Sequence, residues 1–195
     1  MQNHDQNNLY TPLYKMVPNS VLSIKNRART WQYGYNEKYN FVVISKSGQI
    51  QDVININGLN IALPKPPATI YSRNKKTEEQ YWEPHILPKE LKKIQSIFQW
   101  HDTPPQFKNK WVDYIESEFD KREEGFWFMN NGNPTYLTGT HYMYLQWTKI
   151  DIGHPDFREA NRLFYVFWEA CKADKRSFGM CYLKIRRSGF SFMSS

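Results

Sequence analysis

The sequence predicts an α/β fold, in which an antiparallel β region is followed by helices and then by a strand leading into a basic loop. Short β-type apolar runs separated by turn residues fill residues 39–63, whereas helical spacing of apolar residues prevails in segments between residues 88 and 171. Near the end of the chain, the apolar run GMCYL is flanked by charged residues, as is typical of a buried strand of a parallel sheet.

The composition is that of an ordinary globular protein. Of the 195 residues, 40% are hydrophobic and 23% are charged, which excludes a chain that is disordered throughout. No apolar run is long enough to cross a membrane, and the first residues lack the features of a secretory signal. Cys171 and Cys181 are too few for a disulfide framework or a Cys-rich zinc site. We therefore expect a soluble protein of the cytoplasm.

The first 67 residues predict two segments. Residues 1–38 are expected to form an N-terminal arm and a short helix, the latter over residues 21–30. Residues 39–67 predict a three-stranded antiparallel meander with strands near residues 41–44, 50–56 and 59–63. Its turns are expected at Ser47-Gly48 and at Asn57-Gly58, and Asn-Gly is the dipeptide that most strongly favours a tight hairpin.

Residues 68–124 predict a linker followed by helices. The first helix is expected over residues 88–100, and the second over residues 105–122, with Gly125 at its end. The apolar stripe of the second helix has residues spaced by four, namely Phe107, Trp111, Ile115 and Phe119. Its acidic residues are expected to be solvated; they are Glu116, Glu118, Asp120, Glu123 and Glu124.

Residues 125–195 form the last predicted segment. Residues 126–139 favour a strand-turn-strand or a loop with its turn at Asn131-Gly132, and a helix is expected over residues 140–148. A further helix is expected with Asp156 as its N-cap and Glu159 at the third position, a capping-box pattern. The predicted buried strand over residues 179–183 follows that helix.

Positive charge is concentrated just before the end of the chain. The formal net charge is +7, and the segment from Lys172 to Arg187 holds the cations Lys172, Lys175, Arg176, Lys184, Arg186 and Arg187 against the single anion Asp174. Such a segment favours polyanionic partners, nucleic acid or nucleotide phosphates, although a solvated basic face would have the same composition.

A strand, a short basic glycine-containing loop and a helix, in that order, are typical of a phosphate-binding loop. Gly189 lets the backbone approach phosphate closely, Ser191 offers a hydroxyl for Mg²⁺, and nearby basic side chains supply charge. The loop departs from the standard pattern, because Lys184 replaces the first glycine and Phe190 replaces the lysine. On the pattern alone, a strand followed by a basic surface turn is a more frequent interpretation than a phosphate-binding loop.

The segment KIRRSGFS, residues 184–191, resembles the deviant Walker A loop of the large terminase subunits of tailed phages. Three upstream segments resemble the same family: residues 39–48, residues 125–145 and HPDFR at residues 154–158. The resemblance covers most of the chain from about Trp31. It implies that residues 125–195 begin a P-loop NTPase domain that binds ATP and Mg²⁺.

The resemblance also implies roles for individual residues. Lys184 would contact the β- and γ-phosphates, Arg187 would add a second cation, and Ser191 would hold Mg²⁺. The nucleotide-binding set implied by the loop is Lys184, Arg186, Arg187, Ser188, Gly189, Phe190 and Ser191. Phe157 and Arg158 occupy a place comparable to the adenine-contacting segment, and packing of these two residues into the core is an equally good interpretation.

Terminase large subunits carry an acidic Walker B pair and a nuclease domain downstream of the loop. Neither has a counterpart before Ser195, so we expect the chain to be an N-terminal portion that is inactive alone. The implied partners are duplex DNA, the portal protein, the small terminase subunit and other copies of the chain, in the host cell cytoplasm. The alternative is a non-enzymatic nucleic-acid-binding or interaction module whose basic loop contacts phosphate.

Overall fold

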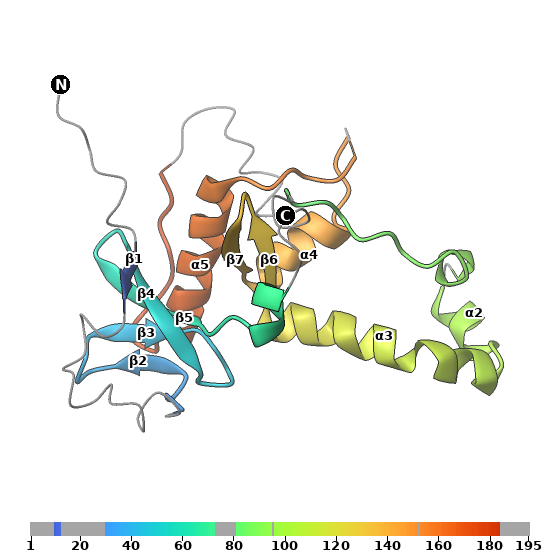
Figure 1. Ribbon diagram of the computed structural model, residues 1–195, viewed down its shortest axis with the longest axis horizontal. Coiled ribbons are helices and arrows are strands. Elements are labelled where there is room, and N and C mark those ends of the chain that lie inside the picture. The colour runs from blue at the N-terminus through green and yellow to red at the C-terminus, as the bar shows by residue number, and fades with distance from the viewer. Residues whose placement is uncertain (1–9, 13–29, 73–80, 95, 152, 184–195) are drawn as a thin grey trace.

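The computed structural model describes residues 10–12, 30–72, 81–94, 96–151 and 153–183. Within these residues it shows a mixed α/β fold with a five-stranded sheet, a two-stranded hairpin and four α-helices (Figure 1). The sheet consists of β1 (Tyr10–Pro12), β2 (Gly34–Asn36), β3 (Phe41–Val43), β4 (Ile50–Ile56) and β5 (Leu59–Pro64). The α/β class is therefore confirmed. The predicted helix over residues 21–30 lies almost wholly outside the described residues.

The three predicted strands of residues 39–67 are present, but they do not form a meander. The order across the sheet is β1-β4-β5-β3-β2, so β5 lies between β3 and β4 and pairs with β3 in parallel. The Asn57-Gly58 hairpin is confirmed, because both residues have positive φ and β4 pairs antiparallel with β5. The turn at Ser47-Gly48 is also confirmed, because Gly48 has positive φ and its N–H donates to the Ser45 carbonyl at 3.1 Å. The Gly48 carbonyl in turn accepts a hydrogen bond from the Trp31 N–H at 2.8 Å. Because β5 takes the place beside β3, the chain does not fold straight back from β3 onto β4.

Both faces of the sheet are covered. One face packs on helix α5 (Glu159–Ala173), where Val166, Ala170 and Ala173 meet Val42 and Ile54. The other face carries an aromatic cluster in which Trp31 contacts Tyr39 and Phe41 edge-on, at ring-centroid distances of 5.4 and 5.3 Å. Because side chains on both faces of the sheet are covered, every residue of a short strand such as β3 can be apolar.

A second core lies between the hairpin and two helices. The hairpin pairs β6 (Phe126–Asn130) with β7 (Asn133–Leu137), and α4 (Gly139–Trp147) follows. Positive φ at Asn131 and Gly132 places the turn where the sequence predicts it. The helix predicted over residues 140–148 is also confirmed. Its side chains join those of the hairpin and α5 in a cluster formed by Phe128, Leu137, Tyr144, Leu145, Phe164 and Tyr165.

Helix α3 (Pro105–Glu124) confirms the second helix predicted in residues 68–124 and points away from the sheet (Figure 1). Gly125 ends it with a φ of 86°, where a Cβ would lie 2.4 Å from the Tyr136 hydroxyl. The single helix predicted over residues 88–100 is wrong. The chain forms two short pieces there, a 3₁₀ turn at Leu91–Lys93 and α2 (Ile97–His101). Ile97 and Phe98 are 68% and 77% exposed, so burial does not hold one continuous helix together.

Helix α5 begins later than predicted. Its N-cap is Arg158, not Asp156, and no side chain caps it. The carboxylate of Glu159 accepts hydrogen bonds from the Arg162 Nε at 2.8 and 2.9 Å, so it turns forward along the helix instead of back toward Asp156. A further 3₁₀ turn, η2 (Ala68–Ser72), follows β5. None of the helices in the described ranges is both long enough and apolar enough to cross a membrane.

Candidate functional site

The predicted phosphate loop lies outside the described residues. This holds for every nucleotide-binding residue implied by the resemblance, and so for the Mg²⁺ ligand Ser191. Those residues are Lys184, Arg186, Arg187, Ser188, Gly189, Phe190 and Ser191. The structure does describe the segment that leads into the loop, residues 174–183, and the predicted adenine contacts Phe157 and Arg158.

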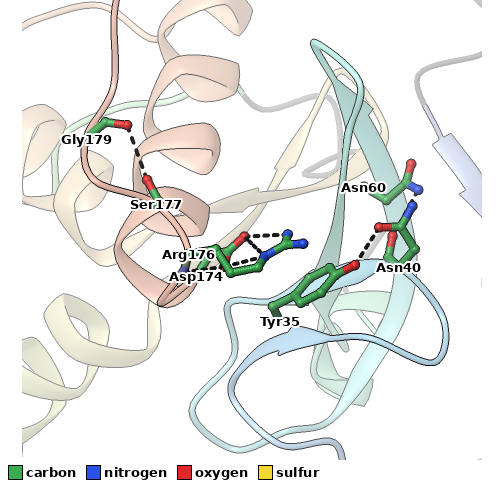
Figure 2. Close-up of polar contacts among 7 residues, drawn as sticks. All are labelled: Tyr35, Asn40, Asn60, Asp174, Arg176, Ser177 and Gly179. Atoms are coloured by element: carbon green, nitrogen blue, oxygen red, sulfur yellow. Dashed lines mark hydrogen bonds and ion pairs between the residues drawn. The ribbon is translucent and has the colours of Figure 1, made fainter.

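The segment leading to the loop is anchored where α5 ends. The Arg176 guanidinium donates to the Asp174 carboxylate, from Nη2 at 2.8 Å and from Nε at 3.0 Å, and it lies 3.1 Å from the centroid of the Tyr35 ring (Figure 2). The hydrogen bonds from Arg176 lower the pKa of Asp174, whose side chain is buried. One cation of the predicted basic segment is thus used to attach that segment to the sheet.

The anchor continues into the sheet through polar contacts. The Tyr35 hydroxyl donates to the Asn40 side-chain oxygen at 2.9 Å, and the Asn60 amide donates to the Asn40 carbonyl at 3.1 Å (Figure 2). The backbone also comes close, because a Cβ on Gly34 would lie 3.1 Å from the Ala173 carbonyl oxygen. Position and direction of the chain at residue 176 are therefore set by β2 and its neighbours.

Residues 179–183 do not form the predicted strand. Phe178 is fully exposed and Leu183 is 98% exposed, while the Tyr182 ring lies against the Phe164 ring at 5.1 Å. The Ser177 hydroxyl donates to the Gly179 carbonyl at 3.2 Å, which makes a local turn (Figure 2). A buried parallel strand needs a hydrogen-bonded neighbour on each side, and the described residues provide none for this segment. An apolar run between charges was insufficient to identify a strand.

Phe157 and Arg158 lie in different environments. The Phe157 ring is half-buried in the second core, 5.2 Å from the Phe128 ring and 5.9 Å from the His141 ring. Arg158 is exposed at the start of α5. The core-packing interpretation therefore describes Phe157, whereas Arg158 remains free to meet a ligand at the surface. An adenine contact by these residues stays a prediction.

His141 and Arg162 form a buried basic pair that the sequence did not reveal. His141 has no exposed surface and its ring stacks on Tyr165 at 4.7 Å, and neither ring nitrogen has a hydrogen-bond partner among the residues that the structure describes. Burial, with a contribution from the Arg162 charge, lowers the pKa of His141 to about 3, so the ring is neutral at physiological pH. Arg162 is 1% exposed and is paired with Glu159. Both side chains are packed in the interior. The five histidines are scattered along the sequence, and their spacing did not indicate that His141 is buried.

Glu118 corrects another expectation. It is 7% exposed, not solvated, and its carboxylate accepts hydrogen bonds from the Tyr142 hydroxyl and from the Lys121 ammonium, both at 2.6 Å. This contact joins α3 to α4. No group of His, Cys, Asp and Glu side chains among the described residues is arranged to hold a metal ion.

The geometry thus gives a mixed α/β domain whose basic segment is anchored by Asp174 and Arg176 just before the predicted loop. No family model, no curated protein and no solved structure matches the chain.

Proposed function

We propose that the chain is the N-terminal portion of a viral terminase large subunit, the motor that moves duplex DNA into procapsids. The single observation that carries the proposal is the segment KIRRSGFS at residues 184–191. It combines a leading lysine, two arginines, a glycine and a hydroxyl in the order expected of a deviant Walker A loop. The upstream segments that resemble the same family support it.

In this function the loop binds ATP and Mg²⁺. Lys184 contacts the β- and γ-phosphates, Arg187 adds a second cation, the backbone around Gly189 donates N–H groups, and the Ser191 hydroxyl holds Mg²⁺. In the complete subunit, a Walker B carboxylate pair orients the metal and the attacking water. The partners are duplex DNA, the portal protein, the small terminase subunit and further copies of the subunit, in the host cytoplasm.

The anchor at Arg176 is compatible with this function. A phosphate loop must be held at a fixed place relative to the rest of its domain, because catalysis of phosphoryl transfer depends on position. Arg176 lies eight residues before Lys184, where it is hydrogen-bonded to Asp174 and lies on the Tyr35 ring. In the alternative function, a nucleic-acid-binding module, the cations of the basic segment would contact the phosphate groups of the nucleic acid. In the described part of the segment Lys172 is paired with Glu169 and Arg176 with Asp174, which favours the motor.

The test is Lys184→Ala in the complete subunit, with ATP turnover and DNA affinity measured together. If Lys184 meets charge that develops on the γ-phosphate, kcat falls by about 10² or more while DNA affinity changes little. The matched control is Lys175→Ala, which removes an exposed cation of the same basic segment. It is expected to leave turnover unchanged.

A second variant sharpens the test. Phe190→Lys restores a lysine at the ordinary Walker A position, so it is expected to recover part of the turnover lost in Lys184→Ala. Unchanged turnover in Lys184→Ala, with DNA binding that is weaker and less dependent on salt by a slope of about one, would contradict the nucleotide site. That result would support the nucleic-acid-binding module.

A further inference from the structure

A small cavity lies between the sheet and the β6–β7 hairpin, away from the segment leading to the predicted loop. It has a volume of about 140 Å³ and is lined by Gln51, Asp52, Leu63, Pro66, Trp127 and Tyr136, together with Pro134. Pockets for drug-sized or nucleotide-sized ligands are usually larger, roughly 300 Å³ or more. The cavity therefore suits the end of one side chain.

Asp52 is an unusual residue for its position. It pairs across the ladder with Leu63 and lies two residues before Ile54, and both of these belong to the core that packs on α5. A carboxylate thus stands on a sheet face that is otherwise apolar. Burial raises the pKa of Asp52, and no hydrogen bond or ion pair joins its carboxylate to another residue in the described part of the chain. Asp52 is half-buried, and a carboxylate that is partly withdrawn from water is stabilised by a cation beside it.

A β-bulge places this carboxylate. Ile50 pairs with Pro64 and Asp52 with Leu63, so Gln51 is an extra residue on β4. The bulge also separates Ile50 from Asp52, because Ile50 joins the aromatic cluster on the opposite face. Bulges often re-aim a side chain next to a functional site. Here the extra residue turns both Gln51 and Asp52 toward the cavity.

The walls of the cavity provide aromatic surface beside the carboxylate. The Trp127 and Tyr136 rings lie 5.4 Å apart, and the Tyr136 hydroxyl is already used, since it donates to the Glu124 carbonyl at 2.8 Å. Tyr136 therefore offers its ring rather than its hydroxyl. A carboxylate next to aromatic rings attracts a cation that has a flat apolar face, which is the chemistry of a guanidinium.

The same protein already shows this combination elsewhere. At the end of α5, the Arg176 guanidinium is hydrogen-bonded to Asp174 and lies on the Tyr35 ring (Figure 2). Asp52 and Trp127 offer the corresponding carboxylate and ring at the cavity. We propose that the cavity binds the guanidinium of an arginine side chain presented by a partner protein, with Asp52 as the ion-pair partner and Trp127 as the stacking surface.

The experiment titrates the protein with blocked arginine, N-acetyl-arginine-methylamide, and follows the indole N–H signals by NMR. The matched probe is the citrulline analogue, which has the same shape without the charge. We expect the arginine probe to shift the Trp127 signal, assigned by its loss in Trp127→Phe, and to bind about tenfold more tightly than citrulline. Equal binding of the two probes, or no shift at Trp127, overturns the proposal.

Two variants locate the carboxylate. Asp52→Asn keeps the shape of the side chain and is expected to weaken the arginine probe about tenfold, to the level of citrulline. Asp113→Asn, an exposed acid on α3, is the control and is expected to have no effect. An equal loss in both variants would show attraction by overall charge and would overturn the site. If Asp52→Asn does not fold, the comparison of arginine with citrulline on the unaltered protein still decides.

Two further probes define the ligand. Blocked lysine is expected to bind more weakly than blocked arginine, because an ammonium cannot stack as a flat group. Equal affinity would contradict the guanidinium assignment. The peptide Gly-Arg-Gly is expected to bind at least as tightly as blocked arginine, since only the side chain enters. If blocked arginine binds and the peptide does not, the cavity is a small-molecule site and the partner proposal fails.

Discussion

The five-stranded sheet and helix α3 place their apolar residues in opposite environments. Val42, Val43, Ile54 and Ile61 have no exposed surface, and they come from strands of three to seven residues. Helix α3 has 20 residues, and among them only the charged Glu118 is buried. Its apolar stripe is half-exposed, and Phe119 is 57% exposed.

The difference follows from how each element satisfies its backbone. A strand needs neighbours for its hydrogen bonds, so residues in a short strand are drawn into a packed layer. A helix closes its hydrogen bonds internally and can extend away from the rest of the molecule, as α3 does (Figure 1). An apolar stripe at helical spacing therefore predicts that a helix forms, but it does not predict which part of the molecule packs against that stripe.

The largest expected effect compares the same substitution in both regions. Ile54→Ala in the sheet is expected to lower the free energy of unfolding by about 2–5 kcal/mol, because it removes fully buried methyl groups and leaves a cavity. Ile97→Ala in α2, next to α3, is expected to change it by less than about 0.5 kcal/mol, because Ile97 is 68% exposed. Urea unfolding of both variants measures the difference. Similar losses in the two variants would mean that α2 is covered in solution.

The same contrast explains how much of the fold could be predicted from the sequence. Local signals were sufficient for the Asn57-Gly58 and Asn131-Gly132 turns and for the end of α3 at Gly125, since these depend on backbone conformation. Strand order was not predicted, because it depends on the parallel pairing of β3 with β5, two strands that are not consecutive in the sequence. GMCYL resembled a strand, yet no strand in the described part of the chain pairs with it.

The candidate site was predictable only in part for a similar reason. Charge marked the basic segment, but the pairing of Asp174 with Arg176 on Tyr35 depends on how α5 meets β2. The burial of His141 and Glu118 depends on α4 packing against two other helices. Asp52 was not singled out, because the extra residue in β4 becomes visible only in its pairing with β5.

The second prediction uses pH to compare a buried histidine with an exposed one. The folded-state pKa of His141 is lowered to about 3, so the unfolded chain binds a proton more readily below its own pKa of about 6.5. The free energy of unfolding is therefore expected to fall by up to about 1.4 kcal/mol per pH unit as pH decreases from about 6 to 4. His141→Phe, which keeps an aromatic ring in the stack, removes this contribution.

The control for this prediction is His101→Phe at the exposed end of α2, which makes the same substitution at a surface histidine. Asp174 does not contribute to the slope in this pH range. Its pKa is lowered by Arg176, so its contribution is lost as pH falls through that lowered value, below the range used. If His141→Phe retains the full slope, His141 is accessible to protons in the folded protein.

A smaller effect is expected where α3 does contact a core. Tyr142→Phe removes the hydroxyl that donates to Glu118 and leaves a buried carboxylate with one partner fewer. We expect a loss of about 1–3 kcal/mol in the free energy of unfolding, measured with urea. Tyr35→Phe removes a hydroxyl that bonds to Asn40 in an exposed setting and is the matched control, with a smaller loss. An equal loss in both variants would contradict the buried role of Glu118.

The smallest effect concerns a direct link between the two regions. The Lys46 ammonium, in the loop after β3, lies 3.2 Å from a carboxylate oxygen of Glu123 near the end of α3, and the two side chains are 53% and 67% exposed. Exposed ion pairs contribute about 0.2–1 kcal/mol, and high salt screens them. A double-mutant cycle with Lys46→Ala and Glu123→Ala is expected to give a coupling energy in that range at low salt and none at about 1 M salt.

A larger coupling that resists salt would show that this contact is desolvated, and that α3 is held against the sheet more firmly than its exposed stripe indicates. A coupling near zero at low salt would leave the buried Glu118–Tyr142 contact as the stronger attachment of α3, because that contact is shielded from water and ions.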